Sequence, residues 1–187
     1  MIPIEDKNEK WTLFLDRDGV LNEEIHGGYV NEWKEFRFYP DTLSSLQTLS
    51  DFFHPIIVVT NQRGVGKGIT KLENLHIIHE NMIQEIQKNG GRIDRVYFCS
   101  DIDSESACRK PNPRMALQAK ADFPKIDFNK SIMVGNNLSD MQFGKRLEMH
   151  TVFITSTHPE MDNTHPDIDM IFPDLSSFAS WMMSKIC

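Results

Sequence analysis

Two aspartates that follow an apolar run are the residues of this sequence that most suggest chemistry. Asp16 and Asp18 are spaced i, i+2 at the end of the apolar run 13–15, and Gly19 follows. Side chains alternate along a strand, so the two carboxylates can share one side near its end. Paired carboxylates bind hard divalent cations, and a carboxylate can also attack phosphorus. Taken alone, the string is equally compatible with a solvated Asp-x-Asp-Gly turn.

The elements that must position these aspartates can be predicted from apolar periodicity. We expect strands over 12–15, 55–60, 95–99, 131–134, 151–154 and 170–172. We expect helices over about 42–49, 70–88, 112–121, 139–147 and 175–185, with a loop or flap over 22–37 and a flexible turn over 64–68. Asp41 can cap the first helix. Strands that alternate with helices predict a single α/β domain over 1–187 with a doubly wound, mostly parallel sheet and helices on both faces.

Polar residues follow most of the predicted strands. They are Asp16 and Asp18 after the first, Thr60 and Asn61 after the second, Lys110 beyond the third, and Asn136 and Asp140 after the fourth. In open α/β sheets, ligands bind beyond the carboxyl ends of the strands. The sequence therefore predicts an active site at this edge.

Phosphoryl transfer from a monoester needs the residue types that gather there. Asp16 fits the nucleophile, and Asp18 fits the acid that protonates the leaving group and later acts as a base. Thr60 offers a hydroxyl donor and Lys110 a positive charge. Magnesium, which prefers oxygen ligands, fits as the cation.

The order of these motifs resembles the haloacid-dehalogenase (HAD) phosphatase superfamily. Its branch of histidinol-phosphate phosphatases and D-glycero-D-manno-heptose 1,7-bisphosphate phosphatases is the most similar. The supporting strings are Phe14-Leu15-Asp16-Arg17-Asp18-Gly19, Gly28-Tyr29-Val30, Val59-Thr60-Asn61-Gln62-Arg63-Gly64, Cys108-Arg109-Lys110-Pro111 and Val134-Gly135-Asn136-Asn137-Leu138-Ser139-Asp140. The resemblance implies a HAD-like Rossmannoid fold without a large cap domain, closed instead by the 22–37 flap.

The resemblance also implies roles for individual residues. Asp16 would attack and bind Mg²⁺, and Asp18 would transfer the proton and ligate the cation through its backbone carbonyl. Thr60 and Lys110 would hold phosphoryl oxygens, with Lys110 also restraining Asp16. Asp140 would support the metal site directly or through water.

Four further residues are expected to contact the substrate. The resemblance implies that Asn61 touches the phosphate, that Arg109 reaches the distal part of the substrate, and that Tyr29 lies near the site. Arg63 adds positive potential for an anionic substrate or lies in a solvated loop.

The sequence departs from the family pattern at two places. Asn136 stands where an aspartate usually binds magnesium; its carbonyl can still ligate the cation, but it brings no charge. The family's structural zinc loop of three Cys and one His is reduced here to Cys99 and Cys108, with Asp101 and Ser106 at the other two positions. A structural zinc is therefore not expected.

Composition limits the other possibilities. The chain has 187 residues and a net charge of −7, which argues against a nucleic-acid partner. Three cysteines argue against a disulfide scaffold, and no stretch approaches the ~20 apolar residues of a membrane span. We expect a cytoplasmic protein that is a monomer or a weak homo-oligomer. His76 and His79, spaced i, i+3 on a predicted helix, are expected to be solvated rather than a metal pair.

The sequence thus predicts a Mg²⁺-dependent phosphomonoester hydrolase that works through an aspartyl-phosphate on a small phosphorylated metabolite, foremost a heptose bisphosphate. A histidinol-phosphate phosphatase would use the same reacting residues. A non-catalytic module that binds phosphosugars for regulation is the alternative from another class, and Asn136 is the feature that favours it.

Overall fold

The chain folds around one parallel sheet. The structure is a computed structural model and describes residues 2–4, 11–161 and 164–186. The strands run in the order β3-β2-β1-β4-β5-β6, all parallel to their neighbours. Their bounds are β1 Trp11–Leu15, β2 Phe53–Asn61, β3 Arg95–Cys99, β4 Ser131–Gly135, β5 His150–Ile154 and β6 Met170–Phe172. All six predicted strands are therefore confirmed.

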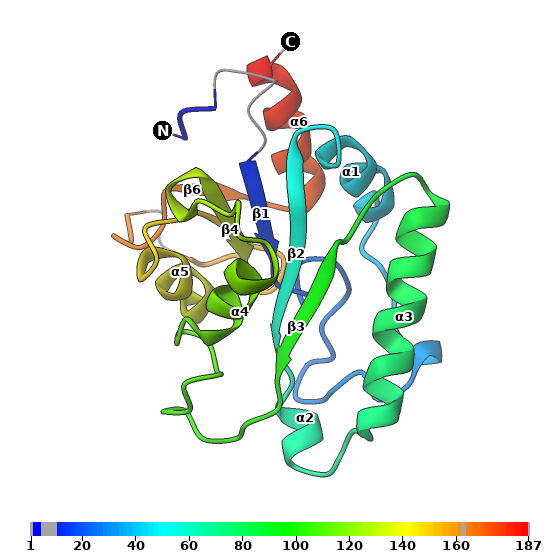
Figure 1. Ribbon diagram of the computed structural model, residues 1–187. Coiled ribbons are helices and arrows are strands. Elements are labelled where there is room, and N and C mark those ends of the chain that lie inside the picture. Colours follow the sequence, from blue (N-terminus) through cyan, green and yellow to red (C-terminus); the bar gives the residue numbers. More distant parts are fainter. Residues whose placement is uncertain (1, 5–10, 162–163, 187) are drawn as a thin grey trace.

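Helices cover both faces of the sheet, as Figure 1 shows. They are α1 Thr42–Leu49, α2 Arg63–Gly66, α3 Leu72–Lys88, α4 Arg114–Asp122, α5 Leu138–Lys145 and α6 Leu175–Ile186, with short 3₁₀ turns at Trp33–Glu35 and Phe128–Lys130. Side chains of β1 alternate between two apolar cores: Leu13 and Leu15 pack toward α1, α3 and α6, whereas Phe14 packs toward α4 and α5. Each face of the sheet therefore has its own apolar core and its own layer of helices, as parallel strands buried on both faces require. This confirms the doubly wound architecture.

Two local expectations are wrong. Asp41 has φ 60° and makes no side-chain cap; its carbonyl instead accepts the hydroxyls of Ser44 and Ser45. The glycine-rich stretch predicted as a flexible turn instead overlaps the short helix α2. Gly64 packs so closely on Thr70 and Tyr29 that a Cβ would meet both, which fixes the position of this segment.

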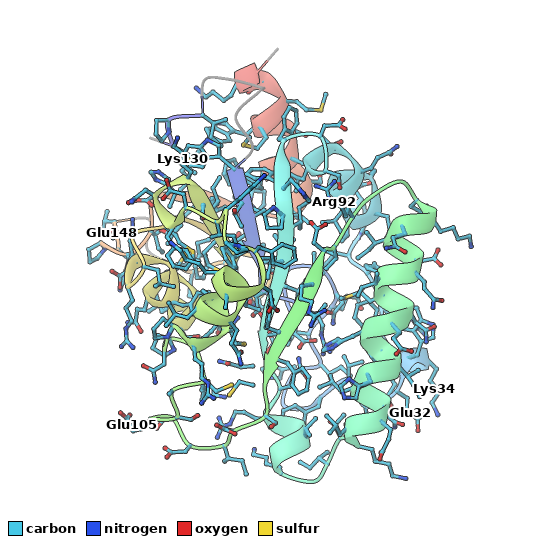
Figure 2. All side chains as sticks on the ribbon, in the orientation of Figure 1. Glu32, Lys34, Arg92, Glu105, Lys130 and Glu148 are labelled. Atoms are coloured by element: carbon cyan, nitrogen blue, oxygen red, sulfur yellow. The ribbon has the colours of Figure 1, made fainter. Side chains whose placement is uncertain are left out.

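The predicted flap over 22–37 is anchored at its far end. Val30 and Phe36 are buried in the core beneath α3, and Asn31 accepts a hydrogen bond from the Thr70 hydroxyl at 2.7 Å. Figure 2 places Glu32 and Lys34 at the outer edge near α3, where their charged atoms lie 2.7 Å apart. The longest continuous exposed stretch of the flap is 23–28, and residues 32, 34, 35 and 37 are exposed between its buried anchors.

The sheet order reverses direction between β1 and β4. From β1 the chain adds β2 and β3 on one side, and β4 to β6 lie on the other. A crevice opens at such a switch point, outside the carboxyl ends of the two central strands. Asp16, the first residue after β1, lies at this crevice, and its backbone N–H donates to the carbonyl of Val134 at 2.9 Å. None of the helices in the described ranges is long and apolar enough to cross a bilayer.

Candidate active site

A buried ammonium joins two carboxylates at the switch point. Lys110 is 2% exposed, and its Nζ lies 2.9 Å from Oδ1 of Asp16 and 2.6 Å from Oδ1 of Asp140. Burial alone would lower the pKa of Lys110, but the two adjacent carboxylates outweigh burial and raise it. Lys110 is therefore a fixed positive charge at the end of β1.

The first turn of α5 holds Asp140 in place. Its Oδ2 accepts the backbone N–H of Asn137 at 3.0 Å, and its Oδ1 faces Lys110. A carboxylate is favoured here because the N-terminus of a helix carries partial positive charge. Gly135 at the end of β4 leaves room, since a Cβ there would lie 2.3 Å from Asp140 Cβ.

Asp16 presents one oxygen to its neighbours and keeps the other available. Its Oδ1 accepts the backbone N–H of Arg17 at 2.8 Å and contacts Lys110. Within the described residues no hydrogen bond or ion pair involves Oδ2. Burial, the largest effect, raises the pKa of Asp16, and the Asp140 charge raises it further. The Lys110 ammonium lowers it, but the pKa remains above its ordinary value. A second positive charge beside Oδ2 would hold the carboxylate in its ionised, nucleophilic form.

Asp18 is clamped by three side chains. Nη2 of Arg17 reaches its Oδ1 and Oδ2 at 2.7 and 2.8 Å, Asn22 donates to Oδ1 at 3.0 Å, and Gln62 donates to Oδ2 at 2.9 Å. Burial opposes ionisation, but the Arg17 charge and these hydrogen bonds outweigh burial and lower the pKa of Asp18. This arrangement stabilises the carboxylate, the form that accepts a proton.

The end of β2 supplies a hydroxyl and an anchor for Lys110. The Thr60 hydroxyl lies at the cavity and accepts a hydrogen bond from Gln62 Nε2 at 2.9 Å. The Asn61 amide bonds to the Lys110 backbone in both directions, at 3.0 and 3.3 Å. Asn61 therefore fixes the main chain that carries the ammonium, in addition to lining the same cavity.

These groups line one cavity of about 220 Å³ at the carboxyl edge. Its walls are Asp16, Asp18, Glu24, Ile25, Gly28, Tyr29, Thr60, Asn61, Gln62, Arg63, Arg109, Lys110, Asn137, Ser139 and Asp140. Arg63 and Arg109 each bury one guanidinium nitrogen that has no hydrogen-bond partner among the described residues. Burial, and after it the nearby Arg63 charge, lowers the pKa of Arg109. Two adjacent guanidinium groups with spare donors suit an anionic ligand.

Comparison with known proteins identifies the family. Residues 107–178 match the family model described as HAD-hydrolase-like. The chain is 36% identical over 139 residues to D-glycero-alpha-D-manno-heptose-1,7-bisphosphate 7-phosphatase of Mycobacterium tuberculosis (strain ATCC 25618 / H37Rv), covering 74% of this chain and 73% of the relative. The corresponding beta-heptose enzyme of Pasteurella multocida is 34% identical over 155 residues, with 79% and 83% covered. The chain belongs to the HAD phosphatase family.

Solved structures agree on the fold. The D,D-heptose 1,7-bisphosphate phosphatase from B. bronchiseptica, complexed with magnesium and phosphate, superposes with a TM-score of 0.83 at 24% identity, covering 93% of this chain and 99% of that one. The enzyme of the same name from Burkholderia thailandensis gives 0.68 at 25% identity, with 94% and 100% covered. The HAD-like Rossmannoid fold expected from the motifs is confirmed.

In this HAD phosphatase Asn136 lies behind the cavity wall. It is fully buried, and its side chain packs so closely on Gly19, which has φ +83°, that a Cβ at Gly19 would lie 2.0 Å from Nδ2. Nδ2 donates to Thr157 Oγ1 at 2.7 Å and to Glu24 Oε2 at 3.3 Å, while Oδ1 accepts from Asn137 at 3.1 Å. The amide therefore connects the turn after β4 with the flap.

Four neighbours of the site were not predicted as functional residues. Arg17, Gln62 and Glu24 contact predicted site residues, as described above. His79 was expected to be solvated, which is wrong: it is 6% exposed, and its Nε2 lies 3.2 Å from Arg17 Nη1. Burial, and to a lesser extent the Arg17 charge, lowers the pKa of His79 to about 3.

The donors around the cavity fit a hard divalent cation. Carboxylate oxygens of Asp16, Asp18, Glu24 and Asp140 line it, and Mg²⁺ takes oxygen ligands. Cys99, Asp101 and Cys108 form a separate group whose ligand atoms lie within 4.8 Å of one another. Structural zinc takes four ligands, mostly Cys or His. In the described part of the chain this group offers two thiols and one carboxylate, and Ser106 donates a hydrogen bond to that carboxylate, so it does not fit a structural zinc site.

Proposed function

We propose that the protein is a Mg²⁺-dependent phosphatase that removes a phosphoryl group from a heptose bisphosphate through an aspartyl-phosphate on Asp16. The observation that carries the proposal is the Lys110 ammonium, 2.9 Å from Asp16 and in the same cavity as Asp18 and Thr60. A nucleophile, a proton-transfer group and phosphate-binding donors meet there.

In the first step, Oδ2 of Asp16 attacks phosphorus and the phosphorus–ester oxygen bond breaks. Asp18 gives a proton to the departing sugar oxygen. Lys110 and the Thr60 hydroxyl stabilise the charge that develops on the phosphoryl oxygens. Asp16, Asp18 and Asp140 would hold Mg²⁺, which when bound would neutralise further charge on the phosphoryl oxygens. Asp18 is ionised in its contact with Arg17, so it must leave that contact and take up a proton before it can act as the acid.

In the second step, water attacks the phosphorus of the aspartyl-phosphate and Asp18 takes its proton. The bond between phosphorus and Oδ2 of Asp16 breaks, which releases inorganic phosphate and restores the carboxylate. Asp18 is ionised in this structure, which is the form that takes up a proton, and it must release some of its five hydrogen bonds to accept one from water.

The relatives' names and the arginines together support a heptose bisphosphate as substrate. The relatives in Mycobacterium tuberculosis and Pasteurella multocida are heptose-1,7-bisphosphate 7-phosphatases. Arg63 and Arg109 offer spare donors to a second phosphate, with Tyr29 beside them. Histidinol phosphate carries an imidazole and a cationic amine instead of a second phosphate, and two guanidinium groups would repel that positive charge.

The proposal is tested by measuring phosphate release from a heptose 1,7-bisphosphate, histidinol phosphate and a generic aryl phosphate, each with and without Mg²⁺. We expect Mg²⁺-dependent turnover, fastest with the bisphosphate. Asp16→Asn should abolish turnover at unchanged circular dichroism, whereas Asp103→Asn in the exposed loop after β3 should not. Absence of Mg²⁺-dependent turnover, or comparable turnover by Asp16→Asn, would contradict the mechanism. Binding of phosphosugars without turnover would favour the non-catalytic module.

The remaining expectations stay proposals. They are one phosphatase domain over 1–187, a cytoplasmic location, and a monomeric or weakly associating state. Size-exclusion chromatography coupled to light scattering would measure the state of association.

A further inference from the structure

One carboxylate of the cavity lacks a basic partner. Asp16 and Asp140 both contact Lys110, and Asp18 contacts Arg17. Glu24, from the exposed stretch of the flap, lines the same cavity. Across the described ranges no Lys or Arg nitrogen lies within ion-pair distance of Glu24, and the Asn136 amide donates to it at 3.3 Å. Burial, and after it the Asp18 charge, raises the pKa of Glu24, and the Asn136 hydrogen bond and the His158 charge only partly oppose this.

The charges around the reacting end of the cavity do not balance. Four carboxylates line this end, and three of them contact one of two basic groups, Lys110 and Arg17. With all four carboxylates ionised, the form that binds a cation, two negative charges remain, which one divalent cation neutralises. We assign the other two cavity cations, Arg63 and Arg109, to the substrate phosphates under the function proposed above.

The Asn136 amide holds Glu24 toward this end of the cavity. Asn136 is fully buried against Gly19 and is fixed by Thr157 and Asn137, so its amide cannot turn freely. An aspartate at 136 would place a second carboxylate about where Nδ2 now donates to Glu24, and the two charges would repel each other. The carboxylate of Glu24 can therefore occupy this position because residue 136 is a neutral amide that donates a hydrogen bond to it.

We propose that Glu24 is a ligand of the divalent cation and supplies the negative charge that Asn136 lacks, with Asn136 as the positioning residue. This inference rests on the proposed function, because it concerns the same cation. The Glu24 carboxylate contacts the cation directly or through one of its waters, since Mg²⁺ keeps several waters when bound by proteins. The flap thereby contributes to the metal site as well as to the cavity wall.

Metal binding tests the inference without reference to activity. Mn²⁺ serves as the probe, and the loss of its free electron paramagnetic resonance signal measures binding to the whole chain. Glu24→Gln keeps the size and hydrogen-bonding capacity of the side chain and removes the charge. We expect it to weaken Mn²⁺ binding roughly tenfold to a hundredfold, the usual range when a group that supports a metal is lost.

Glu23→Gln is the matched control. It changes the net charge by the same amount on the adjacent residue of the same flap, and Glu23 does not line the cavity. We expect wild-type Mn²⁺ affinity for this variant. Equal Mn²⁺ affinities for wild type, Glu24→Gln and Glu23→Gln would overturn the inference.

A double-variant cycle isolates the exchange of charge between the two positions. Asn136→Asp should bind Mn²⁺ more tightly than wild type but unfold more easily without metal, because two carboxylates then face each other. In the Asn136→Asp background, Glu24→Gln should relieve that repulsion and cost less than about threefold in Mn²⁺ affinity, against the tenfold to hundredfold loss expected in the wild-type background, because the new carboxylate at 136 already supplies the charge. Independent, additive effects of the two substitutions would contradict the inference.

The outcomes separate this inference from the proposed function. Wild-type protein that hydrolyses the bisphosphate with Mg²⁺ while Glu24→Gln binds Mn²⁺ normally overturns the inference alone. Wild-type protein that binds Mn²⁺ through Glu24 but hydrolyses none of the phosphate esters overturns the function and leaves the metal site in place.

Discussion

The buried His79 should make the stability of the protein depend on acid. Its pKa is lowered from 6.5 to about 3, first by burial and then by the adjacent Arg17. Between these two values the unfolded chain binds a proton at this histidine and the folded chain does not. Stability therefore rises with pH across this window and is lost as the pH falls from about 6.5 toward 3.

The size of the effect follows from the unfolded pKa. At pH 5, one and a half units below 6.5, protonation of the unfolded chain at His79 costs the folded state about 2 kcal/mol. At pH 7.5 the cost is close to zero. The value at pH 5 hardly depends on the folded pKa, since that pKa lies well below 5.

Urea unfolding at pH 7.5 and pH 5 measures this difference in wild type and in His79→Gln, which can still accept a hydrogen bond from Arg17. We expect wild type to lose about 2 kcal/mol more than His79→Gln between the two pH values. Other titrating groups are common to both proteins and cancel in the comparison. His76→Gln, on the exposed side of the same helix, should behave like wild type. Identical losses for wild type and His79→Gln would refute the reasoning.

Three further substitutions probe the site. Lys110→Met should lower the free energy of unfolding by about 3–5 kcal/mol, because Asp16 and Asp140 would then face each other unpaired, and urea unfolding measures this. Asn61→Ala should lower it by about 1–3 kcal/mol and reduce kcat, since the Lys110 backbone loses both its hydrogen bonds. Arg109→Gln should raise KM for a heptose bisphosphate roughly tenfold to a hundredfold and leave KM for a generic aryl phosphate nearly unchanged. Equal rises for both substrates in steady-state assays would show that Arg109 does not bind a second phosphate.

Positions that depend on the backbone alone could be predicted from the sequence. Parallel strands end at the same edge, so Asp16 and Thr60, which close two neighbouring apolar runs, had to lie near each other. Lys110 follows a loop of ten residues after β3, and strand geometry does not determine where such a loop ends. Its place beside Asp16 was predicted from the family's motif order, and the structure agrees.

The side chains that hold the site could not be predicted in the same way. The clamp on Asp18 depends on Gln62, which lies after another strand, and on Arg17, whose side chain folds back onto its neighbour. Asn61, which was predicted to contact phosphate, lines the cavity, and nothing in the sequence indicated that its amide also bonds to the Lys110 backbone. Such choices among hydrogen-bond partners depend on side-chain rotamers and on elements far apart in the sequence.

His79 is the residue for which the sequence held an overlooked signal. It lies four residues after Leu75 and three before Met82, both of which belong to the apolar stripe of α3. That spacing places it on the buried face of the helix. A polar residue on such a face needs a partner, and Arg17 supplies one at 3.2 Å.

The charges buried at the switch point are better explained by chemistry than by stability. Taking Lys110, Asp16 and Asp140 out of water costs several kcal/mol per ion, and well-packed apolar residues of similar size would give a fold at least as stable. The clamp on Asp18 likewise adds a buried Arg17 that itself needs His79 and Phe36 as neighbours. Asp16 and Asp140 share Lys110, Asp18 has Arg17, and Glu24 has no Lys or Arg contact among the described residues but accepts a hydrogen bond from an amide. A cavity arranged in this way is left with negative charge at one end and spare guanidinium donors elsewhere, and a divalent cation with a doubly phosphorylated ligand would neutralise both.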